Sequence, residues 1–259
     1  MARLKEVFSG GGLKVGTFVG EFATPGIGYI LKNAGLDFVF LDMEHTGFDV
    51  MTVKSLLRYF EAADLPCVIR PAGKDYYDMA RVLDVGAEGL ILPMVSGAEE
   101  VRQIVHACKY APIGGRGVAL SIMHDHFTPG AVLEKLDRAN RETMIFPLIE
   151  TVAGVEAVEE IAAIDGVDGL WLGHFDLSCS LGIPGAFDDP RFNAAVERVA
   201  AAGKAVGKPV GRMCNDPAEG MKEYARGFEL LGMSGDIWML QTAMTEATAA
   251  LRKGVAAQR

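Results

Sequence analysis

The sequence predicts an α/β protein, a (β/α)8 TIM barrel that forms a single domain over residues 1–259. Short β-rich runs alternate with longer amphipathic helical patterns, and eight such units fit within the length of the chain. Several runs, such as FVFL and GLILPM, are apolar throughout, which is typical of parallel strands covered on both faces. A doubly wound sheet is the alternative, but it usually contains fewer strands. No linker or low-complexity segment divides the chain.

The predicted elements follow one another at regular intervals. The eight strands are expected at residues 15–19, 38–42, 67–70, 89–93, 144–150, 169–173, 209–213 and 228–233. Helical spacing of apolar residues follows the second to sixth strands, over 49–63, 75–87, 97–110, 153–164 and 188–206. Asp49, Asp75 and Asp236 occupy positions where helix N-caps are expected. Residues 111–142 read as an irregular connection, and one of this length is usually a functional loop.

The composition excludes several classes of protein. A net charge of −9 argues against binding to nucleic acid or to an anionic membrane, because both need a basic face. The beginning, MARLKEVFSG, lacks the apolar stretch of a signal peptide, and no apolar run is long enough to span a membrane. The cysteines form no C-x-x-C pair, so we expect a cytoplasmic protein with reduced thiols.

Polar side chains gather at the carboxyl ends of four predicted strands. His45 follows the second strand, Arg70 ends the third, Glu150 ends the fifth, and Asp176 follows the sixth. In a closed barrel these ends converge on the face where barrel enzymes have their active sites. The structural alternatives are that the acids cap helices, that His45 is only a hydrogen-bonded histidine, and that Arg70 forms an ion pair with Glu44 or Glu150.

The two carboxylates indicate a metal site. Oxygen ligands suit a hard divalent ion such as Mg²⁺ or Mn²⁺, and Glu150 and Asp176 would leave about four octahedral positions for water and substrate. His45 can act as an acid or a base near neutral pH. No lysine ends a predicted strand, which argues against catalysis through a Schiff base.

The motifs around these residues resemble the HpcH/HpaI family of metal-dependent, class II pyruvate aldolases. The resemblance covers nearly the whole chain and is carried by D-x-E-H, R-P, L-D-x-G-A, P-M-V, R-G, I-E-T and D-L-S at their spacings. It implies a barrel of the phosphoenolpyruvate/pyruvate type, with Mg²⁺, Mn²⁺ or Co²⁺ held by Glu150 and Asp176. It also implies a homohexamer, a trimer of dimers that exchange their last helix, here residues 236–254.

The same resemblance implies roles for individual residues. His45 matches the catalytic base, Asp84 the acid that makes this histidine more basic, and Arg70 the arginine that stabilises the developing enolate. The backbone around Phe175 and Asp176 matches the part that receives the pyruvate carboxylate.

Two positions depart from the pattern of the family. Leu148 stands where the family usually has a glutamine that contacts substrate, so one hydrogen bond of the pocket is expected to be missing. After Gly173, His174 and Phe175 replace the usual Pro-Ala or Pro-Ser beside the metal ligand. Met213, at the end of the seventh strand, is expected to line the aldehyde end of the pocket. These differences concern the identity of the substrate more than the metal.

The predicted reaction is the cleavage of a 4-hydroxy-2-oxo acid to pyruvate and an aldehyde, or the reverse aldol addition. Oxaloacetate decarboxylation, a citrate-lyase-like reaction on an acyl-CoA ester, and a non-catalytic barrel that binds 2-oxo acids are the alternatives. An enzyme for acyl-CoA should have a basic cluster near the site, and the sequence shows none. A protein that only binds its ligand has no need of a base such as His45.

Overall fold

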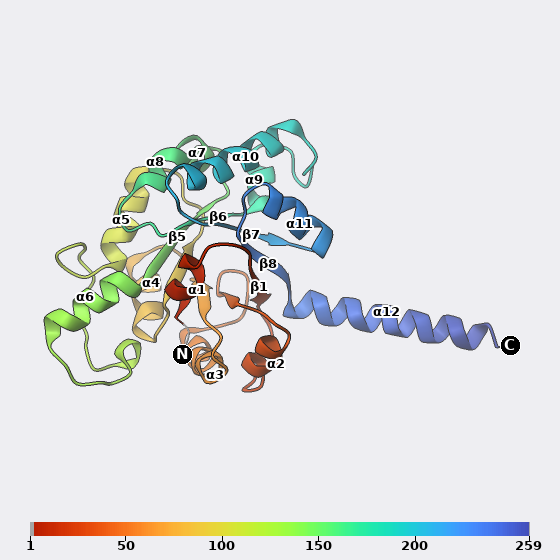
Figure 1. The fold of residues 1–259 in the computed structure, drawn as a ribbon, viewed down its shortest axis with the longest axis horizontal. Coiled ribbons are helices and arrows are strands. Elements are labelled where there is room, and N and C mark those ends of the chain that lie inside the picture. The colour runs from red at the N-terminus through yellow and green to blue at the C-terminus, as the bar shows by residue number, and fades with distance from the viewer. Residues whose placement is uncertain (1–2, 259) are drawn as a thin grey trace.

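A computed structural model describes residues 3–258 and shows a closed barrel of eight parallel strands surrounded by helices (Figure 1). Each strand pairs with the next, and β8 closes the barrel against β1. The strands are β1 (Lys14–Val19), β2 (Phe38–Asp42), β3 (Cys67–Arg70), β4 (Gly89–Leu92), β5 (Met144–Ile149), β6 (Leu170–Leu172), β7 (Val210–Cys214) and β8 (Leu230–Gly235). All eight coincide with predicted strands to within two residues at each end, so the (β/α)8 prediction is confirmed.

Four of the five helical segments that the apolar spacing predicted are single helices, and the segment 153–164 is divided at Ala157 into two short ones. The helices are α1 (Leu4–Ser9), α2 (Ile27–Asn33), α3 (Val50–Ala62), α4 (Tyr76–Asp84), α5 (Ala98–Cys108), α6 (Val132–Glu142), α7 (Val152–Glu156), α8 (Val158–Ala163), α9 (His174–Ser180), α10 (Pro190–Ala205), α11 (Pro217–Ala225) and α12 (Asp236–Ala256), with a 3₁₀ turn at Met123–Asp125. The prediction of an irregular connection over residues 111–142 was wrong in its second half, where α6 lies. Its sequence is mostly polar, and its buried positions are Lys135, Leu136 and Asn140, so no apolar stripe marks it as a helix.

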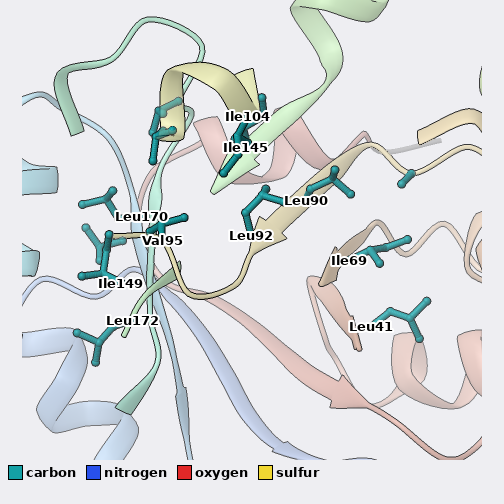
Figure 2. Close-up of a cluster of buried hydrophobic side chains, with 14 of the residues drawn as sticks. Leu41, Ile69, Leu90, Leu92, Val95, Ile104, Ile145, Ile149, Leu170 and Leu172 are labelled. Atoms are coloured by element: carbon teal, nitrogen blue, oxygen red, sulfur yellow. The ribbon is translucent and has the colours of Figure 1, made fainter. Parts of the chain in front are cut away.

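The apolar side chains of the strands form two separate layers. In β2, Val39 and Leu41 belong to an outer layer between strands and helices, whereas Phe38 and Phe40 belong to the barrel interior. This division follows from the alternation of side chains along a strand. Figure 2 shows part of the outer layer, with labelled side chains from β2 to β6 and Ile104 of α5.

The inner layer fills the barrel from its amino-terminal end upwards. Phe8 of α1 closes that end, with ring centroids 4.9 Å from Phe38 and 5.6 Å from Phe146. Higher up, Phe40 contacts Trp171 across the barrel at 5.4 Å. Because β2 and β6 are not neighbours in the sheet, this contact can only lie inside the barrel. The interior is therefore a packed core whose top forms the floor of any pocket above it.

The three predicted N-caps have different outcomes. The Asp49 carboxylate accepts a hydrogen bond from the Thr52 amide and caps α3, whereas Asp75 precedes α4 without a side-chain cap bond. The prediction for Asp236 was wrong, because this residue is the first of α12 and its carboxylate accepts bonds from the backbone amides of residues 20–22. It fastens the end of β1 to the start of the last helix.

The last helix, α12, extends away from the barrel (Figure 1). Of its residues only Asp236 is buried. None of the helices within residues 3–258 is both long enough and apolar enough to cross a membrane.

Candidate active site

One large pocket opens at the carboxyl ends of the strands and encloses about 490 Å³. Every predicted site residue except Asp84 lines it. These residues are His45, Arg70, Leu148, Glu150, Gly173, His174, Phe175, Asp176 and Met213. Within the described chain no lysine lines this pocket, so a Schiff base with the substrate has no amine to form it. Predicted residues from five strands or strand ends thus converge as the barrel geometry predicts.

The Arg70 side chain is held by two acids that follow from strand register. Asp42 and Arg70 end β2 and β3 in register, so their side chains lie side by side. Arg70 Nε donates to Asp42 Oδ1 at 2.5 Å, and its Nη1 lies 3.0 Å from Glu44 Oε2. Burial alone would lower the pKa of Arg70, but the hydrogen bond and charge of Asp42 outweigh it and raise this pKa. Asp42 and Glu44 therefore orient a guanidinium that stays charged.

Glu150 is a buried carboxylate in a cradle that its neighbours shape. Its side chain is 2 % exposed, and its Oε1 accepts a 2.6 Å hydrogen bond from the Met94 amide. Burial, with a further contribution from the charge of Asp176, raises the pKa of Glu150 to about 7. A Cβ added at Gly173 would come within 2.2 Å of Glu150 Oε2, so glycine is needed where the carboxylate approaches the backbone.

Asp176 lies in the first turn of α9, directly after β6. Together, Glu150 and Asp176 offer carboxylate oxygens from two adjacent strands, which suits a divalent cation. Among the described residues no group of three or more His, Cys, Asp or Glu side chains could hold a metal by itself. The pair fits an ion that takes its remaining ligands from water and substrate.

His45 lines the pocket, but its predicted pairing with Asp84 does not form within residues 3–258. The His45 side chain is 63 % exposed, and its Nε2 lies 3.7 Å from Glu44 Oε2. Asp84, at the end of α4, instead accepts a 2.5 Å bond from Arg116 Nη2. The helical position of Asp84 turns it toward the loop after α5, where the Arg116 guanidinium also lies 4.6 Å from the ring of Tyr110. Within one chain Asp84 is therefore paired with Arg116, and its action on His45 stays a prediction.

His174 and Phe175 form an aromatic wall beside Asp176. The His174 ring lies 4.4 Å from that of Phe175, and both contact Phe187 at 5.4 Å. Burial, followed by the charge of Arg212, lowers the pKa of His174 to about 4, so its imidazole is neutral at physiological pH. Its Nε2 is buried without a hydrogen-bond partner in the described part of the chain. The wall is apolar in character although it contains a histidine.

Sequence reasoning missed several apolar residues of the pocket. They are Phe18, Phe40, Trp171, Leu172, Ile237 and Trp238. Trp171 is 1 % exposed and belongs to the barrel core, but it also contributes to the pocket. The positions of these residues in the sequence could have indicated this, because an inward-facing residue near the carboxyl end of a barrel strand lies directly below the pocket.

The fold and the pocket define a (β/α)8 barrel in which a partly buried arginine and paired carboxylates face one cavity. Residues 15–238 match the family described as HpcH/HpaI aldolase/citrate lyase, and the chain belongs to this family.

Similar proteins span nearly the whole chain. A hydroxypyruvate/pyruvate aldolase from Sagittula stellata is 30% identical, over 93% of this chain and 94% of the relative. The crystal structure of an HpcH/HpaI aldolase from Desulfitobacterium hafniense DCB-2 superposes with a TM-score of 0.91, at 34% identity over 97% of both chains. Citrate synthase SbnG has a similar structure, with a TM-score of 0.87 at 28% identity over 97% of this chain and 98% of that one.

Proposed function

We propose that the protein is a divalent-metal-dependent aldolase that cleaves a 4-hydroxy-2-oxo acid to pyruvate and an aldehyde, and that also catalyses the reverse addition. The observation that carries this proposal is the buried Glu150 beside Asp176, facing Arg70 in a pocket that no described lysine lines. Similarity to a hydroxypyruvate/pyruvate aldolase supports the same class of reaction.

Glu150 and Asp176 would hold the metal ion, which we take to be Mg²⁺, Mn²⁺ or Co²⁺. The room that Gly173 leaves beside Glu150 Oε2 supports this assignment, as does the Met94 amide that fixes the other oxygen. When bound, such a cation polarises the 2-keto oxygen of the substrate as a Lewis acid.

The residues of the chain supply the other parts of the chemistry. His45 removes the proton of the 4-hydroxyl group, and the C3–C4 bond then breaks to give the aldehyde and the pyruvate enolate. The Arg70 guanidinium opposes the negative charge that develops on the enolate oxygen. The enolate takes a proton at C3 and leaves as pyruvate. The backbone around Phe175 and Asp176 receives the substrate carboxylate, with Leu148 and Met213 beside it.

The proposed function is tested by an assay of pyruvate release with a panel of 4-hydroxy-2-oxo acids. We expect pyruvate to form from at least one member, and the activity to disappear after exhaustive treatment with a chelator and to return with Mg²⁺, Mn²⁺ or Co²⁺. Full activity in the absence of metal would overturn the mechanism.

A second candidate uses the same enolate in another reaction, for example by decarboxylating oxaloacetate. Two observations favour keeping it: the structural likeness to citrate synthase SbnG, and the high exposure of His45, which decarboxylation does not need as a base.

Replacing His45 with alanine separates the two candidates. We expect His45→Ala to slow aldol cleavage by about 10²–10⁴-fold, the range of general base catalysis, and to slow oxaloacetate decarboxylation by less than about tenfold. Both rates are measured on one preparation whose melting temperature equals that of the wild type. Equal losses in the two assays would mean that His45 maintains the site without acting as a base.

We also propose a cytoplasmic homo-oligomer, a hexamer built as a trimer of dimers that exchange α12. The four cysteines are free, as in proteins of reducing compartments. Most of the exposed large apolar residues of α12 fall on one stripe that its own barrel does not cover: Ile237, Leu240, Met244, Leu251 and Val255. Trp238 and Met239 are also exposed but lie off this stripe. In such an assembly Asp84 could approach His45 only from another chain, since the two do not pair within one.

Charges placed on this stripe should dissociate the oligomer. We expect the double variant Met244→Glu, Leu251→Glu to have the mass of a monomer or a trimer in multi-angle light scattering, because carboxylates would be buried in the apolar interface that joins each dimer. Thr242→Glu, on the opposite face of α12, is the matched control and should keep the mass of the wild type. A double variant with unchanged mass would exclude α12 as the interface.

A further inference from the structure

The pocket has a polar part and an apolar part, and only the polar part is used by the reaction proposed above. His45, Arg70, Glu150 and Asp176 account for the pyruvate half of the substrate and for the reacting hydroxyl. The rest of the lining consists mainly of side chains with little or no hydrogen-bonding capacity: Phe18, Phe40, Leu148, Trp171, Met213, Ile237 and Trp238. Thr46, Asn215 and Ser234 are polar side chains that also line it.

The floor of the apolar part is rigid, because it is also the top of the barrel core. Phe18 and Phe40 lie 5.8 Å apart in an edge-to-face contact, and Phe40 and Trp171 lie 5.4 Å apart. Leu148 pairs with Trp171 in the register of β5 and β6, so their side chains lie side by side. All four residues are at least 93 % buried, and none can turn away to admit water without opening a cavity in the core.

The rim of the pocket continues this apolar character. Trp238, in the first turns of α12, lies 5.2 Å from the ring of Phe18 and covers its outer side. Phe175 is 60 % exposed and packs against His174 and Phe187. Leu148 is 2 % exposed and offers no hydrogen-bond donor or acceptor to a polar substrate.

We propose that the aldehyde partner of this enzyme is apolar, an aryl or alkyl aldehyde rather than a polyhydroxylated or anionic one. This inference rests on the proposed aldolase function and specifies its substrate class. A hydroxyl group placed against Phe40, Leu148 or Trp171 loses its hydrogen bonds to water and gains none, which costs about tenfold or more in kcat/KM per group. A ring or alkyl chain is instead bound through the hydrophobic effect and contacts between aromatic rings. The pocket volume of about 490 Å³ accommodates pyruvate together with such a ring.

The test is aldol addition of pyruvate to aldehydes in the presence of Mn²⁺. In this step pyruvate C3 loses a proton to the base, C3 bonds to the aldehyde carbon, and the aldehyde oxygen takes up a proton. We expect kcat/KM for benzaldehyde and for propanal to exceed that for glyceraldehyde by at least about tenfold. Propanal and glyceraldehyde share a three-carbon skeleton and differ only in hydroxyl groups. An equal or higher kcat/KM for glyceraldehyde would overturn the inference.

The aldehydes differ in intrinsic reactivity, but this difference cancels when the same two aldehydes are compared in the wild type and in variants of the apolar wall. Met213→Gln and Leu148→Gln introduce an amide of similar size, and we expect each to lower the ratio of kcat/KM for propanal to that for glyceraldehyde by at least about fivefold. Met213→Leu keeps the wall apolar at the same position and should preserve the ratio. Met213 is partly exposed, so its glutamine variant should fold even if Leu148→Gln does not. Unchanged ratios in Met213→Gln would contradict the proposal.

A reaction without aldehyde separates this inference from the function on which it rests. Exchange of the C3 protons of pyruvate with D₂O, followed by NMR, reports formation of the enolate alone. Wild-type exchange combined with a preference for glyceraldehyde overturns the apolar aldehyde but leaves the aldolase intact. If the protein with Mn²⁺ does not exchange these protons, the aldolase function fails and the inference fails with it.

Discussion

Glu150→Gln is expected to weaken Mn²⁺ binding by more than about 100-fold, a larger loss than the 10–100-fold typical when a residue that only supports a metal ligand is changed. Glutamine retains the shape of the side chain, and its amide oxygen can still accept the hydrogen bond of Met94. What it loses is the negative charge that a hard divalent cation requires. The fold should be unharmed, because Glu150 is 2 % exposed and the variant removes the cost of burying its negative charge. Mn²⁺ affinity is measured by electron paramagnetic resonance or calorimetry, and pyruvate release should fall in parallel.

Glu44→Gln provides the control for charge without ligation. Glu44 lies in the same polar region and raises the pKa of Glu150 through its charge, but its carboxylate is bound to Arg70. Both variants remove one negative charge, so the difference between their losses of Mn²⁺ affinity measures direct coordination by Glu150. We expect Glu44→Gln to change the Mn²⁺ affinity by less than about tenfold. Similar losses in the two variants would place the metal elsewhere or reduce its binding to a general electrostatic effect.

Most of the fold could be predicted because its signals are local. The strand β2 is an apolar run that ends in an acid, and the helix after it begins with an aspartate cap, Asp49, that the structure retains. Helix α6 could not be found in this way, since it packs against the barrel through few side chains and one of them is Lys135. The prediction of Asp236 as an N-cap was wrong for a related reason. Its carboxylate accepts hydrogen bonds from the backbone amides of residues 20–22, and no local pattern reveals a partner so distant in the sequence.

The residues of the site could be predicted where the end of a strand determines their position. They could not be predicted where packing against another element determines it. His45, Arg70, Glu150 and Asp176 follow from the convergence of the carboxyl ends of the strands in a barrel. The binding of Arg70 by both Asp42 and Glu44 could be decided only from the register of β2 and β3. Apolar residues of the pocket such as Phe40 cannot be distinguished from core residues by sequence, because in this barrel one layer serves as both.

Arg70→Lys should lower kcat for aldol cleavage by about 10²–10³-fold, the usual loss when one group that stabilises an oxyanion is removed. Arg70 already donates Nε to Asp42 and lies with Nη1 against Glu44. Within residues 3–258 neither contact uses its second terminal nitrogen, the atom that we propose faces the substrate. The single ammonium group of lysine cannot bind both acids and also face the enolate, because it lacks the planar fork of a guanidinium.

The kinetic pattern distinguishes a role in the transition state from a structural one. If Arg70 opposes charge that develops during the reaction, kcat should fall much more than KM rises, and the affinity for Mn²⁺ should remain close to that of the wild type. Deuterium exchange at C3 of pyruvate should slow to the same extent, because that reaction forms the same enolate. Arg191→Lys is the matched control, since Arg191 pairs with Asp189 on the surface of α10 and should be replaceable with less than about twofold effect. A rate for Arg70→Lys within about twofold of the wild type, at an unchanged melting temperature, would show that this arginine only neutralises Asp42 and Glu44.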